Sequence, residues 1–560
     1  MKNPNEPGYS HQQSTKIILN SLMISIIAIQ GVVYFGYGNH QSIFEFLHDS
    51  LSTFLNIADY WNQSPDLCPN VILLMCIYMI SVYSFTVPII SSVTASWPLP
   101  SITVGKPAPD SHVFLIVAHN SSKTGIDETL RALLKLVKPH QIYVADNGSS
   151  KEEEAATDDL CNSMSEEYYL SDPKATVTYI QVGHLSKGNK SFAQYSAVYY
   201  LNEEIEKNKL NVEYVTIIDD DVIVPAHWNY QSIEKLFEDQ TKVALAYPLC
   251  VANSSVNLIT RHQDIEYLTA ACDRVWWDLL GNQLFCNGAM ATWKILPLLN
   301  VLKKHSTCFN GEDLEMGYIL HSLIDIDIIE GKSRKRIGLV TDCIIPTIAP
   351  TCIFHWFDFI PAYLKKKYGL GCEECSQHSF FNQRVRSWDC TSHSFIFKYI
   401  NIITNFKDNF DGKKWIIKLI CLIRLLNIGR DMMLTGAIIY TIHEVIFNAS
   451  SLAIVVFWLD CVLHYWSLMI LLNLRISHIL SPMKKRFQPE MIFFDPIVQI
   501  SQYIFMNAFV SILYSAFRDF WRRFPRSIEE QLKDSKTLEI ELHTAWYKSL
   551  AAHKIHTINE

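Results

Sequence analysis

A short acidic stretch is the strongest constraint on how this chain can fold. Residues 214–225 read YVTIIDDDVIVP, an apolar run of strand length that ends in Asp219, Asp220 and Asp221. Near-continuous Val/Ile runs are typical of strands buried in a parallel sheet, and ligands of open α/β sheets gather at the carboxyl ends of such strands. Three crowded carboxylates repel one another unless a cation compensates, and a divalent metal that carries a phosphate suits them. The alternative is a plain turn or helix cap, which needs only one Asp.

Strand and helix patterns alternate around this stretch, from about residue 101 to residue 346. Alternation of this kind predicts a parallel sheet covered by helices, with nucleotide-type chemistry at its rim. The net charge of -8 does not suggest a nucleic-acid footprint. We expect strands at 112–117, 141–145 and 176–182 and helices at 128–137 and 191–207.

Two uncharged apolar segments precede the α/β region. Residues 17–37 and 71–92 each reach the roughly 20 apolar residues that span a bilayer. A cleaved signal peptide explains the first segment less well, because it is long and a second one follows. The loop at 38–70 has no Lys or Arg, so the positive-inside rule places it outside and the α/β region in the cytosol.

Further apolar segments follow the α/β region. Residues 394–406 and 415–426 suit helices in the membrane interface, or ordinary core helices. Residues 432–474 predict two spans and 497–517 one more. That count would leave the arginines at 518–526 outside, against the positive-inside rule. Either one interfacial segment is a span, or the region from 491 to 517 is re-entrant.

Two motifs in the α/β region suggest a nucleotide. Asp146 ends a predicted strand before Asn-Gly, where it could contact a base or ribose, or simply form a turn. Lys187 and Lys190 flank a Gly-containing loop that opens a helix, which suits a diphosphate. Basic loops of this kind are more often solvated, so the lysine motif is weak alone.

Three later motifs suggest a transfer reaction. Residues 285–290 (FCNGAM) read as a tight loop that permits close backbone approach. Gly311-Glu312-Asp313 opens another helix, where acidic residues favour the helix dipole and Asp313 could act as a general base. Residues 383–388 (QRVRSW) combine two guanidiniums, which grip phosphate, with an indole that offers a flat face to a sugar. A surface Arg–Trp contact is the alternative.

In this order the motifs resemble the membrane-integrated family-2 glycosyltransferases: chitin, cellulose and hyaluronan synthases and fungal-type polysaccharide synthases. The resemblance covers residues 112–388 by motif and the flanks by topology. It implies an α/β fold, with a cytosolic GT-A (Rossmann-like) domain inserted between N- and C-terminal transmembrane helices. The units expected are a disordered tail (1–15), two transmembrane helices (16–92), the GT-A domain (93–345), acceptor-site and interfacial helices (346–430), C-terminal transmembrane helices (431–517) and a C-terminal tail (518–560).

The resemblance also implies a role for each matching residue. Since the set holds one base and no second carboxylate nucleophile, we expect direct displacement with inversion. The family's Q-x-x-R-W box is interrupted here by Ser387, which leaves acceptor placement and processivity open. The expected set is Asp313 as base; Asp146, Asp219, Lys187 and Lys190 for the nucleotide; Asp219 and Asp221 for Mg²⁺ or Mn²⁺; and Gln383, Arg384, Arg386, Trp388 and Glu312 for the diphosphate and acceptor.

The expected function is a multi-pass plasma-membrane enzyme that adds sugar from a UDP-sugar to a growing β-linked polysaccharide. We expect it to be processive, with coupled export, as in the synthesis of a cell wall or capsule. The partners are then the UDP-sugar donor, the growing glycan and the lipid bilayer, and a homo-oligomer is compatible with this arrangement. The alternatives are a non-processive enzyme with a lipid acceptor, similar to ceramide glucosyltransferase, and a catalytically silent membrane scaffold. UDP-GlcNAc, UDP-Glc and UDP-GlcA all remain candidate donors.

Overall fold

The computed structural model describes the α/β region and several shorter pieces that follow it. The expected membrane spans within 16–92 and 431–517 lie outside the described residues, and no helix in the described part is long and apolar enough to cross a membrane. The described residues are 107–119, 121, 123–169, 176–182, 189–207, 209–279, 282–306, 311–322, 335–353, 379–380, 383, 395–404, 418–422, 424–425 and 527–534.

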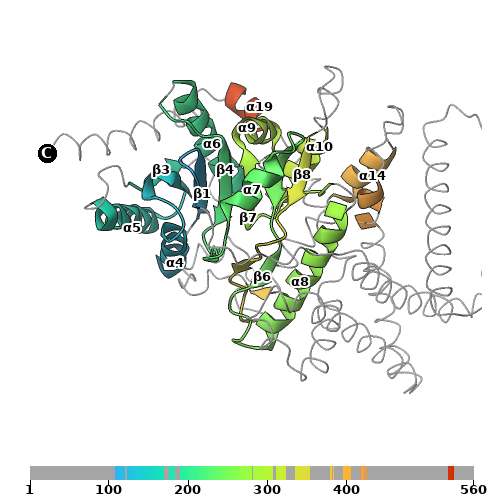
Figure 1. The fold of residues 1–560 in the computed structure, drawn as a ribbon, viewed down its shortest axis with the longest axis horizontal. Coiled ribbons are helices and arrows are strands. Elements are labelled where there is room, and N and C mark those ends of the chain that lie inside the picture. Colours follow the sequence, from blue (N-terminus) through green and yellow to red (C-terminus); the bar gives the residue numbers. More distant parts are fainter. Residues whose placement is uncertain are drawn as a thin grey trace, which may run out of the picture.

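The elements alternate between strand and helix along most of the described chain (Figure 1). In order they are β1 (His112–Ala118), α4 (Lys123–Leu134), a 3-10 turn (Pro139–Gln141), β2 (Ile142–Asn147), α5 (Lys151–Tyr169), β3 (Thr178–Val182), α6 (Lys190–Glu206), β4 (Tyr214–Asp219), α7 (Tyr230–Phe237), β5 (Lys242–Ala246), β6 (Leu249–Val251), α8 (Leu258–Leu279), β7 (Met290–Lys294), α9 (Ile295–Lys304), α10 (Glu312–Ser322), β8 (Arg336–Leu339), β9 (Ile345–Thr347), α14 (Ile396–Thr404) and α19 (Ile528–Asp534).

A mixed, mostly parallel sheet forms the centre of the fold. Seven strands lie in the order β3-β2-β1-β4-β7-β5-β8, and β6 pairs separately with β9. The first four strands are parallel, as the sequence predicts, but β7 is antiparallel to both β4 and β5. Because Met290 at the start of β7 pairs with Ile218 near the end of β4, the loop before β7 meets the carboxyl edge of the parallel strands.

Asp146 and Asp219 lie on either side of β1 at this edge. Ala118 pairs with Asp146 on β2, and Val117 pairs with Asp219 on β4. Neighbouring strands are about 4.8 Å apart, so the two aspartate backbones are separated by about 10 Å. The chain leaves β1 toward β2 on one side and returns to β4 on the other, which makes this a topological switch point, where ligands of such sheets bind.

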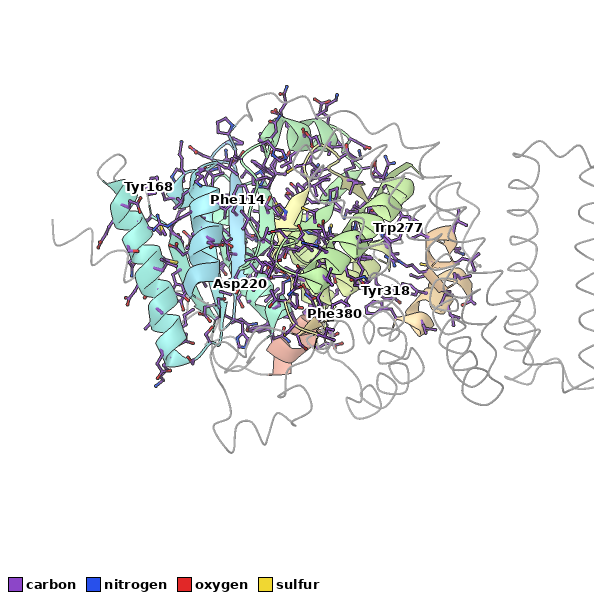
Figure 2. All side chains as sticks on the ribbon, turned by 90° about the horizontal axis from the view of Figure 1, so that it is seen from below. Phe114, Tyr168, Asp220, Trp277, Tyr318 and Phe380 are labelled. Atoms are coloured by element: carbon purple, nitrogen blue, oxygen red, sulfur yellow. The ribbon has the colours of Figure 1, made fainter. Side chains whose placement is uncertain are left out.

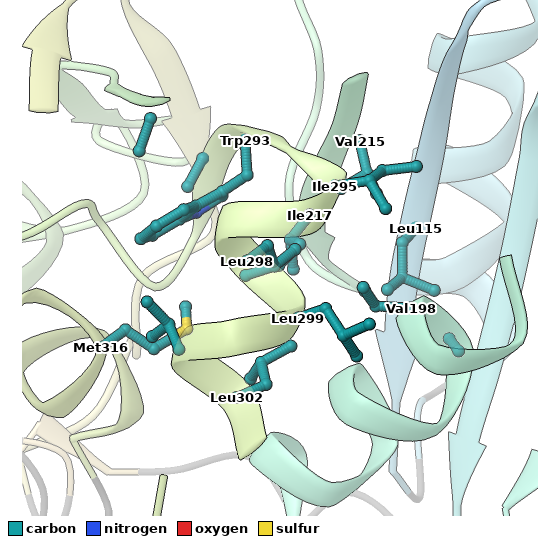
Figure 3. Packing of buried hydrophobic residues seen from close by; sticks show 14 of the residues in the cluster. Leu115, Val198, Val215, Ile217, Trp293, Ile295, Leu298, Leu299, Leu302 and Met316 are labelled. Carbon is teal, nitrogen blue, oxygen red and sulfur yellow. The ribbon is translucent and has the colours of Figure 1, made fainter. Parts of the chain in front are cut away.

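Each face of the sheet has its own apolar core, because successive strand side chains point to opposite faces. Leu115, Val215 and Ile217 point toward α6 and α9, where they pack with Val198 and Leu299 (Figure 3). On the other face Phe114, Ile116 and Ile218 pack against α4, α5 and α7.

Two segments from beyond the α/β region also pack on it. Phe395, just before α14, and Tyr399 of α14 are buried with Trp277 of α8, and Figure 2 shows Trp277 and Tyr318 on the side that faces α14. The helical residues 396–404 fall within the apolar segment at 394–406 that the sequence predicts to be helical. Ile528 of α19 is fully buried in the core beside α9, although the sequence places it in a C-terminal tail.

Candidate active site

One lysine joins the two acidic motifs. The Lys190 ammonium lies 2.6 Å from Asp219 Oδ1 and 2.5 Å from Glu312 Oε1, and it donates a hydrogen bond of 3.1 Å to the carbonyl oxygen of Gly288. Burial opposes the charge on the ammonium, but Asp219 and Glu312 raise the pKa of Lys190 above its ordinary value. The structure therefore gathers four groups around one point at the carboxyl edge of β4.

Local backbone structure holds each of these groups in place. Asn189 caps α6, with its side chain accepting from the Phe192 N–H at 2.9 Å, so Lys190 occupies the first helical position. The Asp219 N–H donates to the Ala289 carbonyl at 3.0 Å, which ties the end of β4 to the loop before β7. Of the predicted lysine motif, Lys190 is thus at the site, and its partners here are carboxylates.

Asp313 lies next to this cluster at the start of α10. Its carboxylate accepts from the Gly288 N–H at 3.2 Å and from the Leu314 N–H at 2.8 Å. Burial and then the neighbouring Glu312 raise the pKa of Asp313 to about 7. A carboxyl group with a pKa near neutrality is well matched to a general base.

Gly288 is the site residue that sequence reasoning does not single out. A Cβ there would lie 3.0 Å from Glu312 Oε1 and 3.5 Å from Lys190 Nζ. The distance to Lys190 is an ordinary contact, whereas a Cβ would require the Glu312 side chain to shift by a few tenths of an ångström, so glycine lets the loop approach Glu312 without this shift. The tight FCNGAM loop is the sequence signal for this approach, although it does not reveal which residues the loop meets.

Asp219 and Asp221 present the oxygen ligands that suit Mg²⁺ or Mn²⁺. Burial, which Lys190 partly offsets, raises the pKa of Asp219, and burial followed by Asp219 raises the pKa of Asp221 well above its ordinary value. A cation would relieve this crowding, so the two residues fit a metal. The described residues contain no group of three or more His, Cys, Asp or Glu that could hold one.

Asp220 has a different environment from its neighbours. Its carboxylate accepts a hydrogen bond from the Ser121 hydroxyl, and its carbonyl accepts from Thr129 Oγ1 at 2.9 Å (Figure 2). The sequence predicts that Asp220 points away from the other two through strand alternation. However, β4 ends at Asp219, and Asp220 and Asp221 lie in a turn.

Asp146 is completely buried at the end of β2. Its Oδ1 accepts from the Ser149 N–H at 3.1 Å across a turn in which Gly148 has a φ of 66°. The carboxylate also lies close to Tyr179, where burial and then Asp146 raise the tyrosine pKa. The turn reading therefore holds, and the nucleotide role of Asp146 stays a prediction.

The Gln383 motif is described only at its first residue. The Gln383 N–H donates to the Ser379 carbonyl at 2.9 Å, and the Phe380 N–H donates to the Cys352 carbonyl at 2.9 Å. The chain between β9 and Cys352 starts beside the acidic stretch, since the Ile348 N–H donates to the Asp221 carbonyl at 3.3 Å. Lys187, Arg384, Arg386 and Trp388 lie outside the described residues.

Comparisons with known proteins give a likeness to solved structures and none to a family model or a curated sequence. No family model and no curated protein matches the chain. Among solved structures the chain is similar to mannosyltransferase PcManGT from Pyrobaculum calidifontis in complex with GDP-Man and Mn²⁺, at 13% sequence identity and a TM-score of 0.44. The match covers 81% of this chain and 100% of that one. At this TM-score the likeness establishes neither a shared fold nor a shared activity.

Proposed function

We propose that the protein is an inverting glycosyltransferase that moves a sugar from a nucleoside-diphosphate donor to a hydroxyl group. The observation that carries this proposal is the Lys190 bridge, which joins Asp219 of the β4 edge to Glu312 beside the candidate base. A carboxylate pair for a metal-bound diphosphate and a base for an acceptor thus meet at the switch point of the sheet.

On the donor side, Asp219 and Asp221 would hold a divalent metal. When bound, the metal neutralises the charge of the leaving diphosphate. Lys190 brings a second positive charge to the same place, and its contacts with Asp219 and Glu312 keep it there. For Asp146, which lies two strands away on β2, we propose contact with the nucleoside end of the donor.

On the acceptor side, Asp313 removes the proton of the attacking hydroxyl. The acceptor oxygen forms the new bond to the anomeric carbon while the bond from that carbon to the diphosphate breaks, and the proton ends on Asp313. Glu312 is paired with Lys190, so the described residues offer no free second carboxylate as a nucleophile at this position. A single displacement inverts the anomeric centre.

For the donor and product we propose a UDP-sugar and a growing β-linked polysaccharide at the plasma membrane. The order of the motifs from Asp146 to the Gln383 region supports this choice, together with the apolar segments that flank the domain. A lipid acceptor is the second candidate, because Ser387 displaces the tryptophan of the acceptor box.

The test is transfer by membranes that carry the full chain. They are incubated with radiolabelled UDP-GlcNAc, UDP-Glc, UDP-GlcA or GDP-Man and with Mg²⁺ or Mn²⁺, and the product is sized. A large, glycosidase-sensitive product supports the polymer, a labelled lipid supports the second candidate, and the absence of turnover with every donor overturns the proposal. Asp313→Asn should lower the transfer rate by about 100-fold or more. The control Asp239→Asn, which changes a surface ion pair with Arg336, should keep the wild-type rate.

A further inference from the structure

A second polar cluster lies beside the first turn of α10. It consists of His305 and Ser306, which follow α9, and Glu315 of α10. All three are buried, with exposed fractions of 0%, 5% and 5%. Buried polar groups are costly unless they are paired, so their contacts indicate what the cluster holds in place.

The His305 ring contacts two backbone carbonyls. Its Nδ1 lies 2.5 Å from the Ser306 oxygen and its Nε2 lies 3.1 Å from the Glu312 oxygen. A carbonyl oxygen only accepts hydrogen bonds and a neutral imidazole carries a single N–H, so it is the Nε2–H tautomer of His305 that donates to the Glu312 carbonyl. The Glu315 carboxylate lies 3.7 Å from Nδ1 and also accepts from the Ser306 hydroxyl. The ring is therefore fixed on both sides.

The carbonyl that His305 holds belongs to the active-site helix. Glu312 is the first residue of α10, and its side chain pairs with Lys190 while the next residue, Asp313, faces Gly288. Carbonyls of the first turn normally bond further along the helix, so a side-chain donor from α9 adds an external anchor at this position.

The C-terminal segment 527–534 contacts the backbone of His305 and Ser306. The Ile528 N–H donates to the His305 carbonyl at 2.9 Å, and Ser306 and Ser527 form an antiparallel bridge. Ser527 and Glu530 cap α19 reciprocally, with hydrogen bonds of 3.0 and 3.2 Å. Figure 1 shows α19 beside α6 and α9.

We propose that His305 is a positioning residue that fixes the start of α10, and so the place of the Asp313 carboxylate against Gly288. This inference rests on the proposed function, in which Asp313 is the base. His305 does not touch the reacting atoms. It acts through the Glu312 carbonyl, and a displacement of about 1 Å at a reacting group can cost about 100-fold in rate.

The test compares two substitutions of similar size in the full chain. His305→Gln keeps an amide N–H that can reach the Glu312 carbonyl, whereas His305→Met fills the space without a donor. Lys304→Gln, exposed on the last turn of α9, is the matched control. Three quantities are measured: kcat, the KM for the nucleotide-sugar, and amide hydrogen exchange in 311–322.

We expect His305→Met to lower kcat by about 10- to 100-fold with a donor KM within about twofold of the wild-type value. Exchange at the start of α10 should rise about tenfold. His305→Gln should keep kcat and the exchange rate close to their wild-type values, and Lys304→Gln should change neither quantity. If the Met variant does not fold, His305→Asn, whose amide is too short to reach Glu312, should show the same losses.

Two results would overturn the inference. In the first, His305→Met, which has no hydrogen-bond donor, keeps the wild-type kcat and exchange rate. In the second, His305→Gln and His305→Met behave alike. The second result would mean that ring volume, and not the hydrogen bond, matters. A wild-type protein without nucleotide-sugar turnover would instead overturn the proposed function. In that case the exchange measurement still decides whether His305 anchors α10.

Discussion

At the scale of single residues, the three adjacent aspartates have separate tasks. Asp219 is paired with Lys190, Asp221 is crowded by Asp219, and Asp220 accepts from Ser121 across the switch point. We expect Asp221→Ala to reduce transfer by about 100-fold or more, because it removes one of the two carboxylates proposed to hold the metal at the diphosphate site.

Asp220→Ala should lower the transfer rate by about tenfold or less, since its carboxylate accepts from Ser121 and is not one of the two proposed metal ligands. Ser121→Ala removes the same bond from the other side and should have a similar effect. The measurement is transfer rate at saturating donor in parallel membrane preparations. Equal losses for Asp220→Ala and Asp221→Ala would contradict this division.

Asp313 gives the pH dependence. Its pKa of about 7 arises from burial and then from Glu312. A base must be deprotonated, so kcat/KM should rise with pH through a midpoint near 7 and fall away in acid. Glu312→Gln removes a neighbouring negative charge, which lowers the pKa of Asp313 and moves this acid limb to lower pH. If the acid side of the kcat/KM profile is unchanged in Glu312→Gln, a group other than Asp313 controls it.

At the scale of elements, α10 depends on a close approach to the loop before β7. A Cβ at Gly317 would clash with the Leu284 carbonyl oxygen and lie 2.8 Å from Phe285 Cα, both of which are backbone atoms. A Cβ at Gly338 would instead meet flexible side-chain atoms of Lys242 at 3.0 Å and Leu245 at 3.1 Å.

Gly317→Ala should therefore lower the free energy of unfolding by about 3 kcal/mol, the upper range for overpacking, while Gly338→Ala should cost about 1 kcal/mol or less. Denaturant unfolding of the two variants gives the comparison. The activity of Gly317→Ala should fall as well, because the same loop presents Gly288 to Asp313. Similar stabilities for the two variants would rule out the backbone clash as the cause.

The elements themselves were largely predictable, and their pairing was not. Continuous apolar runs predict strands such as 112–118, and Asp219 is recognisable because it ends such a run. The antiparallel insertion of β7 has no local signal, because a short strand reads alike in either direction. The Lys190 bridge is equally hidden, since it depends on the fold bringing Glu312 to the end of β4.

At the scale of the whole molecule, the C-terminal contacts constrain how the chain can cross a membrane. α19 is built into the domain through Ile528, so residues 527–534 lie on the same side of any bilayer as the active site. For a chain that spans a membrane as the sequence predicts, we therefore expect an even number of crossings between residues 425 and 527. Because α14 and residues 418–422 pack with Trp277 on the domain, we favour the sequence prediction in which 491–517 is re-entrant.

Cysteine labelling in sealed vesicles tests this arrangement. Glu529→Cys lies on the exposed side of α19, and Lys304→Cys is exposed at the end of α9. A membrane-impermeant maleimide should label both cysteines in vesicles of one orientation and neither in the other, above the background of the unsubstituted chain. The positive-inside rule gives the same side for the arginines at 518–526, which immediately precede the segment. Labelling of the two cysteines from opposite sides would mean that α19 does not pack against α9 in the membrane-bound protein.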